Sequence, residues 1–388
     1  MLFLYILSIL IIIILFFYFY IINKGDSMFK NKRLLLFLVM SLLIFIGLVM
    51  ILSSSYIWAN YKFGDSLKYL KQQLLFVFVG FILIYFILKI DSNFFYNNAK
   101  TFLIIGFLLL ILVLIPGIGK IRNGSRSWFG IGPFGIQPSE AMKLSIIIYV
   151  SKYLSLIRKT NKSFSSILVP LLITGLSFLL IMLQPDFGTG VILVMSVLSI
   201  LFISGTKMKY FYVFGFLGIL GTVLLILIAP YRLDRITSFI NPWSDPLGTG
   251  FQIIQSLYAI GPGGLLGFGF LQSRQKHFYL PEPQTDFIFS VLCEEFGVFG
   301  AFIVVSLFFS LCYLIFKMSL EQNDLFKKYL IFGLGFQIIF QSLLNLSVVI
   351  GLIPVTGVTL PFISYGGSSL LVTMTSIGII LNLAKSSS

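Results

Sequence analysis

The chain is poor in charge, in cysteine and in histidine, and each shortage excludes a class of protein. Charged residues make up 10% of the 388 positions and apolar residues 58%, whereas soluble domains are about 45 to 50% apolar, so a soluble protein is excluded. The two cysteines, Cys293 and Cys312, lie in one predicted helix about 28 Å apart along its axis and cannot pair with each other. The single histidine, His277, supports neither a metal site nor a catalytic triad.

Long apolar runs dominate what is present, and the mean hydropathy is +1.03. The runs are about 18 to 22 residues long, which is the length that a helix needs to cross a bilayer. They lack the short alternating segments of a transmembrane barrel. They predict an all-α polytopic membrane protein with ten core transmembrane helices. The predicted spans are 34–54, 73–90, 101–118, 139–157, 165–183, 188–205, 212–229, 286–316, 329–350 and 367–384.

Lysine and arginine residues near the span ends predict the orientation. About 15 basic residues lie within roughly 50 connector residues on one side, against about 10 in more than twice that length on the other. The dense side is expected to be cytoplasmic, with residues 33 and 385 inside. The net charge of +14 is attributed to this bias and to attraction by anionic membrane lipid. No segment resembles a nucleic-acid-binding module, so no nucleic acid is expected among the partners.

The N-terminal residues 1–33 allow two interpretations. The apolar run MLFLYILSILIIIILFFYFYII is too long for a signal peptide, lacks a basic start and shows no cleavage site. It is either an eleventh span or the product of a wrong start site, since Met28 directly precedes the basic linker FKNKR. Residues 34–385 form one ten-span membrane domain in either case.

Four connectors are expected on the outer face, and they are the places to look for function. They are 119–138, 184–188, 230–285 and 351–366. The loop 230–285, between spans seven and eight, carries Pro, Gly and Trp instead of a polar low-complexity tract, so we expect it to be ordered and partly membrane-dipping. Its Gly-rich part, GPGGLLGFG (261–269), lacks the Lys-Ser/Thr of a phosphate-binding P-loop and does not indicate a nucleotide site.

The chain has only thirteen acidic residues, which makes their positions informative. Asp286 stands at the junction of the long loop and the eighth span, where Thr285 or Asp286 can cap the helix and Asp286 can also act as a general base. Glu294 and Glu295 lie about 12 to 13 Å deeper if the helix is regular. Ionisable groups at that depth are usually paired or functional, and we favour a structural or positioning role for both.

Other charged residues gather near the predicted outer ends of the spans. Glu140 and Lys143, in PSEAMK, are three residues apart at a helix start and share a face, so they form either an ion pair that fixes packing or part of a site. Asp186, in QPDFG, is typical of a turn. Arg126, in RNGSRSWFG, puts positive charge beside an aromatic ring, which suits an anionic group such as diphosphate.

Several long motifs resemble the SEDS family of FtsW, SpoVE and RodA, and most closely its FtsW/SpoVE branch. The resemblance covers about 34–385 in order and rests on five segments. They are NGSRSWFGIGPFGIQPSEAMKL (123–144), QPDFGTGVILV (184–194), RLDRITSFINPWSDPLGTGFQIIQSLYAIGPGGLLGFG (232–269), SRQKHFYLPEPQTDFIFSVLCEEFGVFGA (273–301) and PVTGVTLPFISYGGSSLL (354–371).

The resemblance implies an inverting peptidoglycan glycosyltransferase of the bacterial cytoplasmic membrane, used in cell division or sporulation. Such an enzyme polymerises lipid II on the outer face, with undecaprenyl diphosphate as the leaving group. The implied partners are a class B penicillin-binding protein and other divisome proteins, with a location at the division septum. No cofactor is implied, and a divalent cation at the diphosphate is compatible with the residues.

The resemblance also implies roles for individual residues. Asp286 matches the catalytic base that removes the proton from the acceptor 4-hydroxyl. The expected substrate-binding residues are Arg126, Glu140, Lys143, Asp186, Lys276, Glu282, Ser364, Gly366 and Ser368. Two departures from the family pattern are Gln284 in place of His before Thr-Asp, and Ala141-Met142 in place of Leu-Ala. The first affects the surroundings of Asp286 more than the base itself.

Two other function classes stay open. Intramembrane acids and spans broken by Pro and Gly also suit a flippase for a lipid-linked sugar. A non-catalytic scaffold for division proteins is the third hypothesis. The long outer loop argues weakly against a transporter, whose site is expected near the midplane of the membrane.

Overall fold

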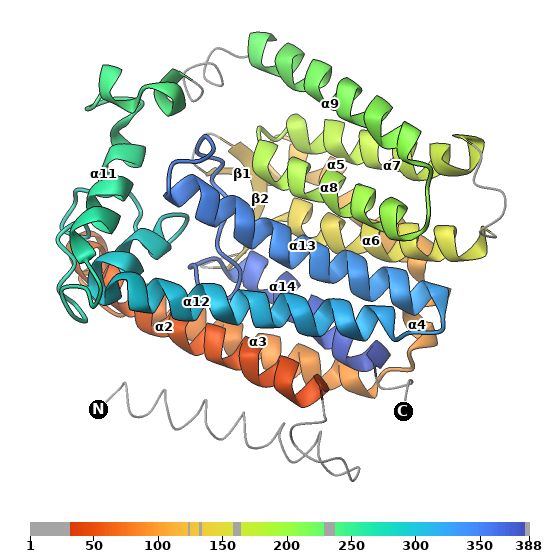
Figure 1. Ribbon diagram of the computed structural model, residues 1–388, viewed down its shortest axis with the longest axis horizontal. Coiled ribbons are helices and arrows are strands. Elements are labelled where there is room, and N and C mark those ends of the chain that lie inside the picture. The colour runs from red at the N-terminus through yellow and green to blue at the C-terminus, as the bar shows by residue number, and fades with distance from the viewer. Residues whose placement is uncertain (1–31, 123–124, 132–133, 158–163, 229–236, 385–388) are drawn as a thin grey trace.

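The computed structural model describes residues 32–122, 125–131, 134–157, 164–228 and 237–384. Long helices lie side by side in a bundle, with α11 at one end and α4 at the other (Figure 1). The helices are α2 (Lys32–Phe63), α3 (Lys68–Lys89), α4 (Asn93–Asn97), α5 (Ala99–Leu114), α6 (Pro138–Leu156), α7 (Phe164–Met182), α8 (Phe187–Ile203), α9 (Met208–Ile228), α11 (Phe251–Ile260), α12 (Ile288–Leu320), α13 (Leu325–Val349) and α14 (Gly367–Leu383).

Each of the ten predicted spans coincides with one of these helices. By length and composition alone, α2, α3, α12 and α13 are long and apolar enough to cross a membrane. Four more apolar segments, 99–114, 167–182, 187–203 and 367–383, are shorter. The count of ten spans therefore stays a prediction. The possible extra span in residues 1–31 lies outside the described residues.

Close helix packing at small residues builds the centre of the bundle. Gly333 of α13 lies against Ile200 of α8 and Ile147 of α6, and a methyl group added there would come within 2.6 Å of the Ile200 side chain. The outer surface is apolar as well, and Phe302 and Phe309 on α12 are 67% and 75% exposed. A helix that is apolar on both its inner and its outer face is typical of a bundle surrounded by lipid.

A small antiparallel sheet lies at the end of the bundle that also carries α11, here called the α11 end (Figure 1). Its strands are β1 (Gly119–Arg122), β2 (Ser125–Ile131) and β3 (Phe134–Ile136), in that spatial order. The register shifts between Lys120 and Ile121. The expectation of an all-α chain describes the bundle and omits this sheet, because glycines interrupt the alternation from which strands are predicted.

The helix α12 is broken near its start, contrary to the regular helix expected over this span. Gly297 has φ of 62° and ψ of −160°, and the Gly-rich segment of the long loop pairs with the open backbone. The amides of Phe268 and Gly269 donate to the carbonyls of Glu294 and Glu295, at 2.9 Å each. Residues 261–269 therefore complete the hydrogen bonding of a broken helix, which is a structural reason for their glycines.

The described part of the long loop is ordered by local hydrogen bonds, as expected. It contains α11 and two short 3₁₀ turns, η2 (Pro242–Ser244) and η3 (Gly261–Gly263). Asp245 accepts hydrogen bonds from the amides of Gly248 at 3.1 Å and Thr249 at 2.7 Å. The hydrogen bonds from Thr249 hold the pKa of Asp245 below its ordinary value. The membrane-dipping part of the expectation stays a prediction.

Substitution of Gly297 by alanine is expected to destabilise the protein by about 2 to 5 kcal/mol. The left-handed backbone costs an L-residue about 1 to 2 kcal/mol, and the added Cβ would lie 2.5 Å from the backbone of Leu265, an overlap that costs about 1 to 3 kcal/mol. The measurement is the melting temperature of the purified protein in detergent. Gly175→Ala on α7, where nothing lies within 4 Å, is the control, and equal melting temperatures for the two variants would contradict the role of Gly297.

Candidate active site

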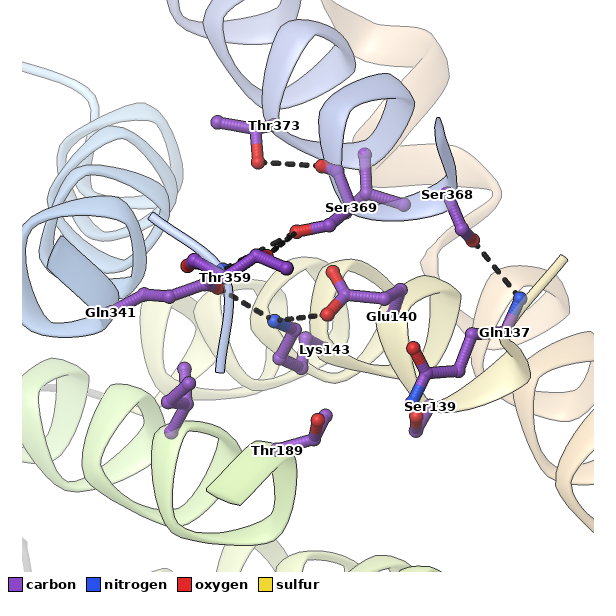
Figure 2. Close-up of polar contacts among 12 residues, drawn as sticks. Gln137, Ser139, Glu140, Lys143, Thr189, Gln341, Thr359, Ser368, Ser369 and Thr373 are labelled. Carbon is purple, nitrogen blue, oxygen red and sulfur yellow. Dashed lines mark hydrogen bonds and ion pairs between the residues drawn. The ribbon is translucent and has the colours of Figure 1, made fainter. Parts of the chain in front are cut away.

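The first two turns of α6 place two opposite charges inside the bundle (Figure 2). The Lys143 ammonium donates to Oε1 of Glu140 at 3.0 Å and to Oε1 of Gln341 on α13 at 2.9 Å. The side chain of Lys143 is 0% exposed. Pro138 begins the helix at a position where its missing amide hydrogen is not needed. The predicted pairing of Glu140 with Lys143 is confirmed, and the pair is buried.

Asp186 joins the start of α8 to the start of α6. As the N-cap residue of α8 it accepts a hydrogen bond from the amide of Thr189 at 3.2 Å. Its other oxygen accepts from Nε2 of Gln137 at 2.7 Å and from the Ser139 hydroxyl at 3.2 Å. The turn role expected for Asp186 is thus a helix cap with two further partners on another helix.

The start of α14 meets the same group of residues. The Ser368 hydroxyl accepts from the amide of Gln137 at 3.0 Å (Figure 2). Three helix starts, those of α6, α8 and α14, are therefore linked by side-chain hydrogen bonds. The N-terminus of a helix carries a partial positive charge and free amide hydrogens. Three such ends beside Lys143 favour an anionic ligand at this place.

Asp286 is held from α13 through its backbone. The side-chain amide of Asn345 donates to the carbonyls of Asp286 at 2.7 Å and Val358 at 2.8 Å. The Thr285 hydroxyl donates to Oδ1 of Asp286 at 2.7 Å. Phe287, not Thr285 or Asp286, occupies the N-cap position of α12, and its side chain makes no capping hydrogen bond. Asp286 therefore stands just before the helix.

One face of α13 connects the two parts of the site. Gln341 and Asn345 are four residues apart and share a helix face. Gln341 accepts from Lys143 and donates through Nε2 to the carbonyl of Thr359 at 3.0 Å. Asn345 donates to the backbone carbonyl of Val358, the residue before Thr359, and to the backbone carbonyl of Asp286. The two amides thus fix the segment 358–359 between the buried cation and the candidate base.

The Ser369 hydroxyl accepts from Nε2 of Gln341 at 3.3 Å and from the Thr359 hydroxyl at 3.2 Å. Five residues of the site were not predicted from the sequence: Gln341, Asn345, Gln137, Thr359 and Ser369. The first two had a signal, because two amides with helical spacing inside the apolar run 329–350 are costly unless they are bonded. The other three sit in connectors or at helix ends, where hydroxyl and amide side chains are common. Their involvement depends on contacts that sequence spacing does not show.

Lys276, Glu294 and Glu295 form a second polar centre. Oε1 of Glu295 accepts from the Lys276 ammonium at 2.8 Å and from the Ser53 hydroxyl of α2 at 2.6 Å. Glu294 accepts from the Ser273 hydroxyl at 2.5 Å and from the amide of Arg274 at 2.9 Å. The structural role that we favoured for both glutamates is consistent with these contacts. The structure places Lys276 here and not beside Lys143.

The remaining predicted residues lie around these two centres. The Ser364 hydroxyl accepts from the amide of Leu360 at 2.9 Å. The amide of Gly366 donates to Oε1 of Gln73 on α3 at 3.3 Å. Glu282 has a left-handed backbone, with φ of 43°. Arg126 lies on β2, paired with Ile121 of β1. Among the described residues, no contact joins Arg126 or Glu282 to Lys143.

Several buried polar atoms around the site lack a hydrogen-bond partner among the described residues. They are Oε2 of Glu140, Oε1 of Gln284, Oδ1 of Asn345 and Oγ1 of Thr356. Such atoms are rare in folded proteins and call for a ligand, a water or an ion. In the part of the chain that the structure describes, no three His, Cys, Asp or Glu side chains are grouped to hold a metal. The divalent cation stays a prediction.

Replacement of Lys276 by methionine is expected to lower stability by about 3 to 5 kcal/mol, because it leaves the buried Glu295 carboxylate without a countercharge. Adding Glu295→Gln is expected to restore most of the loss, since glutamine keeps an acceptor for Ser53. Melting temperatures in detergent test both. Lys71→Met, which breaks an exposed pair with Asp65, is the control and should cost less than about 1 kcal/mol. A double variant as unstable as the single one would contradict the charge pairing.

Comparison with known proteins identifies relatives along almost the whole chain. The model of the FtsW, RodA and SpoVE family, described as cell cycle protein, matches residues 33–388. Stage V sporulation protein E of Bacillus subtilis (strain 168) is 50% identical over 353 residues, which cover 91% of this chain and 96% of that protein. A probable peptidoglycan glycosyltransferase FtsW of Coxiella burnetii is 39% identical over 346 residues, covering 88% and 93%.

Solved structures give the same result. A chain of a peptidoglycan synthase complex, solved in a study of how polymerization and crosslinking are coordinated, aligns with a TM-score of 0.75 and 28% identity, covering 91% of this chain and 97% of that one. RodA of Thermus thermophilus, a rod shape determining protein, aligns with a TM-score of 0.68 and 26% identity, covering 90% and 95%. The resemblance inferred from the motifs and the multi-pass membrane architecture are confirmed. The chain belongs to the FtsW, RodA and SpoVE family of cell cycle proteins.

Proposed function

We propose that this protein is a peptidoglycan glycosyltransferase that polymerises lipid II at the outer face of the cytoplasmic membrane. The names of its relatives support the reaction class. The observation that carries the proposal for this chain is the arrangement around α13, where Gln341 and Asn345 hold a buried cation and a carboxylate-bearing segment on one helix face. A reaction between an anionic donor and a hydroxyl acceptor needs these two groups at a fixed separation.

Asp286 acts as the general base in this proposal. Its carboxylate removes the proton from the acceptor 4-hydroxyl while that oxygen attacks the anomeric carbon of the donor strand. The bond from this carbon to the diphosphate oxygen breaks, and undecaprenyl diphosphate leaves with the bonding electrons. An α-linked donor becomes a β-1,4 linkage, so the configuration inverts. The Thr285 hydroxyl, which donates to Oδ1 of Asp286, helps to aim the second oxygen of the carboxylate.

The diphosphate is assigned to Lys143 and the three linked helix starts, with Arg126 at the approach. Glu140 and Gln341 already hold the Lys143 ammonium in place. Its positive charge therefore does not need to reorganise as negative charge develops on the leaving group. Glu140 orients the ammonium, and Asp186 and Ser368 hold the helix starts in place. Lys276, Glu282, Ser364 and Gly366 are proposed to shape the loops that border the sugar.

The partners follow from the same proposal. A class B penicillin-binding protein would crosslink the strands that this enzyme makes, in agreement with the similarity to a chain of a peptidoglycan synthase complex. Use in cell division or sporulation agrees with the family description, cell cycle protein, and with the name of the sporulation protein. A location at the division septum belongs to the same proposal.

The Asp286→Asn variant is expected to lose polymerisation by a factor of about 10² to 10⁴, which is the usual contribution of a general base. The assay is the formation of glycan polymer from lipid II in proteoliposomes with an outward-facing site. Asp245→Asn, on an exposed turn of the same loop, is the matched control and should keep full activity. Unchanged polymer formation by Asp286→Asn would refute the proposed base, and loss of lipid translocation instead would support a flippase.

The Asn345→Leu variant is expected to lower kcat by about tenfold to a hundredfold with little change in KM. Loss of both hydrogen bonds frees the backbone of Asp286, and a displacement of about 1 Å can cost a hundredfold in rate. Ser342→Ala on the same helix serves as the control, because the Ser342 hydroxyl donates to the carbonyl of Ile338 at 2.9 Å within α13 itself. A rise in KM alone would show that Asn345 contributes to binding instead of positioning the base.

A further inference from the structure

A hollow lies beside the end of α2, outside the polar centres described above. Its volume is about 450 Å³, and its walls come from the end of α2, from the connector to α3 and from the long loop. The lining residues are Tyr56, Ile57, Asn60, Tyr61, Ser66 and Phe278. Tyr61 and Phe278 are 76% and 51% exposed, so the hollow opens to the surroundings of the protein. Aromatic surface is thus combined with hydroxyl and amide groups in one concave site.

Aromatic rings continue from this hollow to the neighbourhood of Asp286. The ring centroid of Phe278 lies 5.3 Å from that of Tyr61 and 5.6 Å from that of Trp58. Trp58 lies close to the hydroxyl of Tyr69, and the centroid of the Tyr69 ring lies 4.9 Å from that of Tyr365. These five residues are called the aromatic track.

The track ends beside the candidate base. The amide of Tyr365 donates to the carbonyl of Gln284 at 2.9 Å, two residues before Asp286. The Glu282 carboxylate is close enough to the Tyr69 hydroxyl to act on it electrostatically. The track is therefore continuous with the proposed active site and is not an isolated surface feature.

The central ring of the track is held by an unusual backbone. Phe278 has φ of 67°, in the left-handed region that bulky residues rarely adopt. Such strain persists only where the surroundings fix it, and it is concentrated at sites of function. A glycine at this position would fold more readily, so the phenylalanine indicates a use for its ring.

We propose that the aromatic track binds the sugar rings of the glycan strand next to the point of transfer. This inference rests on the proposed function and assigns a carbohydrate subsite to it. The C–H face of a pyranose is apolar and stacks on aromatic rings, while its hydroxyl groups bond to side chains such as Asn60 and Ser66.

Two other uses of exposed aromatic rings are less consistent with the contacts. Interfacial anchors point outward into the headgroup region, whereas Phe278 packs edge-on against both Tyr61 and Trp58. A protein-docking surface is expected to be an extended patch with rings standing in pockets of the partner. The track is instead a line of rings that leads from an open hollow to a carboxylate.

Binding can be measured through Trp58. The chain has three tryptophans, so Trp128→Phe and Trp243→Phe leave Trp58 as the single reporter. The probe is a soluble tetrasaccharide of alternating N-acetylglucosamine and N-acetylmuramic acid, added to the full chain in nanodiscs. A saturable change in Trp58 emission is expected. Phe278→Gly should raise the Kd about tenfold, as expected for the loss of an aromatic stacking partner.

Phe278→Gly also separates binding from folding, because glycine relieves the left-handed strain and the melting temperature should not fall. The same variant is expected to make shorter glycan strands from lipid II than the parent does. Tyr258→Ala is the matched control, since Tyr258 is an exposed ring of the same loop that contacts Trp243 at 5.8 Å and not the track. It should change neither Kd nor strand length.

The outcomes distinguish the subsite from the enzyme. If Phe278→Gly keeps both the parental Kd and the parental strand length, the subsite is refuted. The same holds if the variant loses only its association with a class B penicillin-binding protein, which would identify a protein-docking surface. A parent that binds the tetrasaccharide but makes no polymer would refute the proposed function and leave the carbohydrate subsite in place.

Discussion

The burial of Lys143 and Glu140 inside an apolar bundle is the constraint on which the centre of the structure depends. An unpaired ion at such a place costs several kcal/mol, so each charge needs partners within hydrogen-bond reach. Gln341 supplies one from α13, and its own amide is bound by Thr359. The helices α6 and α13 and the connector before α14 therefore cannot shift without separating a polar pair. The rigidity that catalysis requires of a site follows from the cost of burying charge.

The same principle fixes the segment that carries Asp286. Glu294 and Glu295 bind residues 273–276 at one end of it, and Tyr365 and Asn345 bind its other end through backbone carbonyls. Between these anchors the chain passes through strained positions at Phe278 and Glu282. Strained backbone is maintained when both ends are held strongly. The break at Gly297 contributes here too, because it lets the loop reach the backbone carbonyls of Glu294 and Glu295.

Sequence reasoning predicts what depends on local spacing. The spans follow from apolar runs, and the pairing of Glu140 with Lys143 follows from a separation of three residues on a helix. The sheet, the break in α12 and the partners of Lys143 do not follow in this way. Gln341 is 198 residues from Lys143 in the chain, and no local pattern indicates which of the amides in the apolar runs will meet it. Only the family resemblance predicts Asp286 as the base. Its position just before a helix fits a capping residue equally well.

Three chemical environments of the structure correspond to the three parts of a lipid-linked sugar. The outer faces of the helices are apolar, Lys143 and the linked helix starts supply positive charge, and Asp286 and the aromatic track supply a carboxylate and aromatic rings. A molecule with an apolar tail, a diphosphate and a glycan would find a matching environment for each part. The partners that each part gains offset the cost of its desolvation. More of the interaction energy is left to align the reacting atoms.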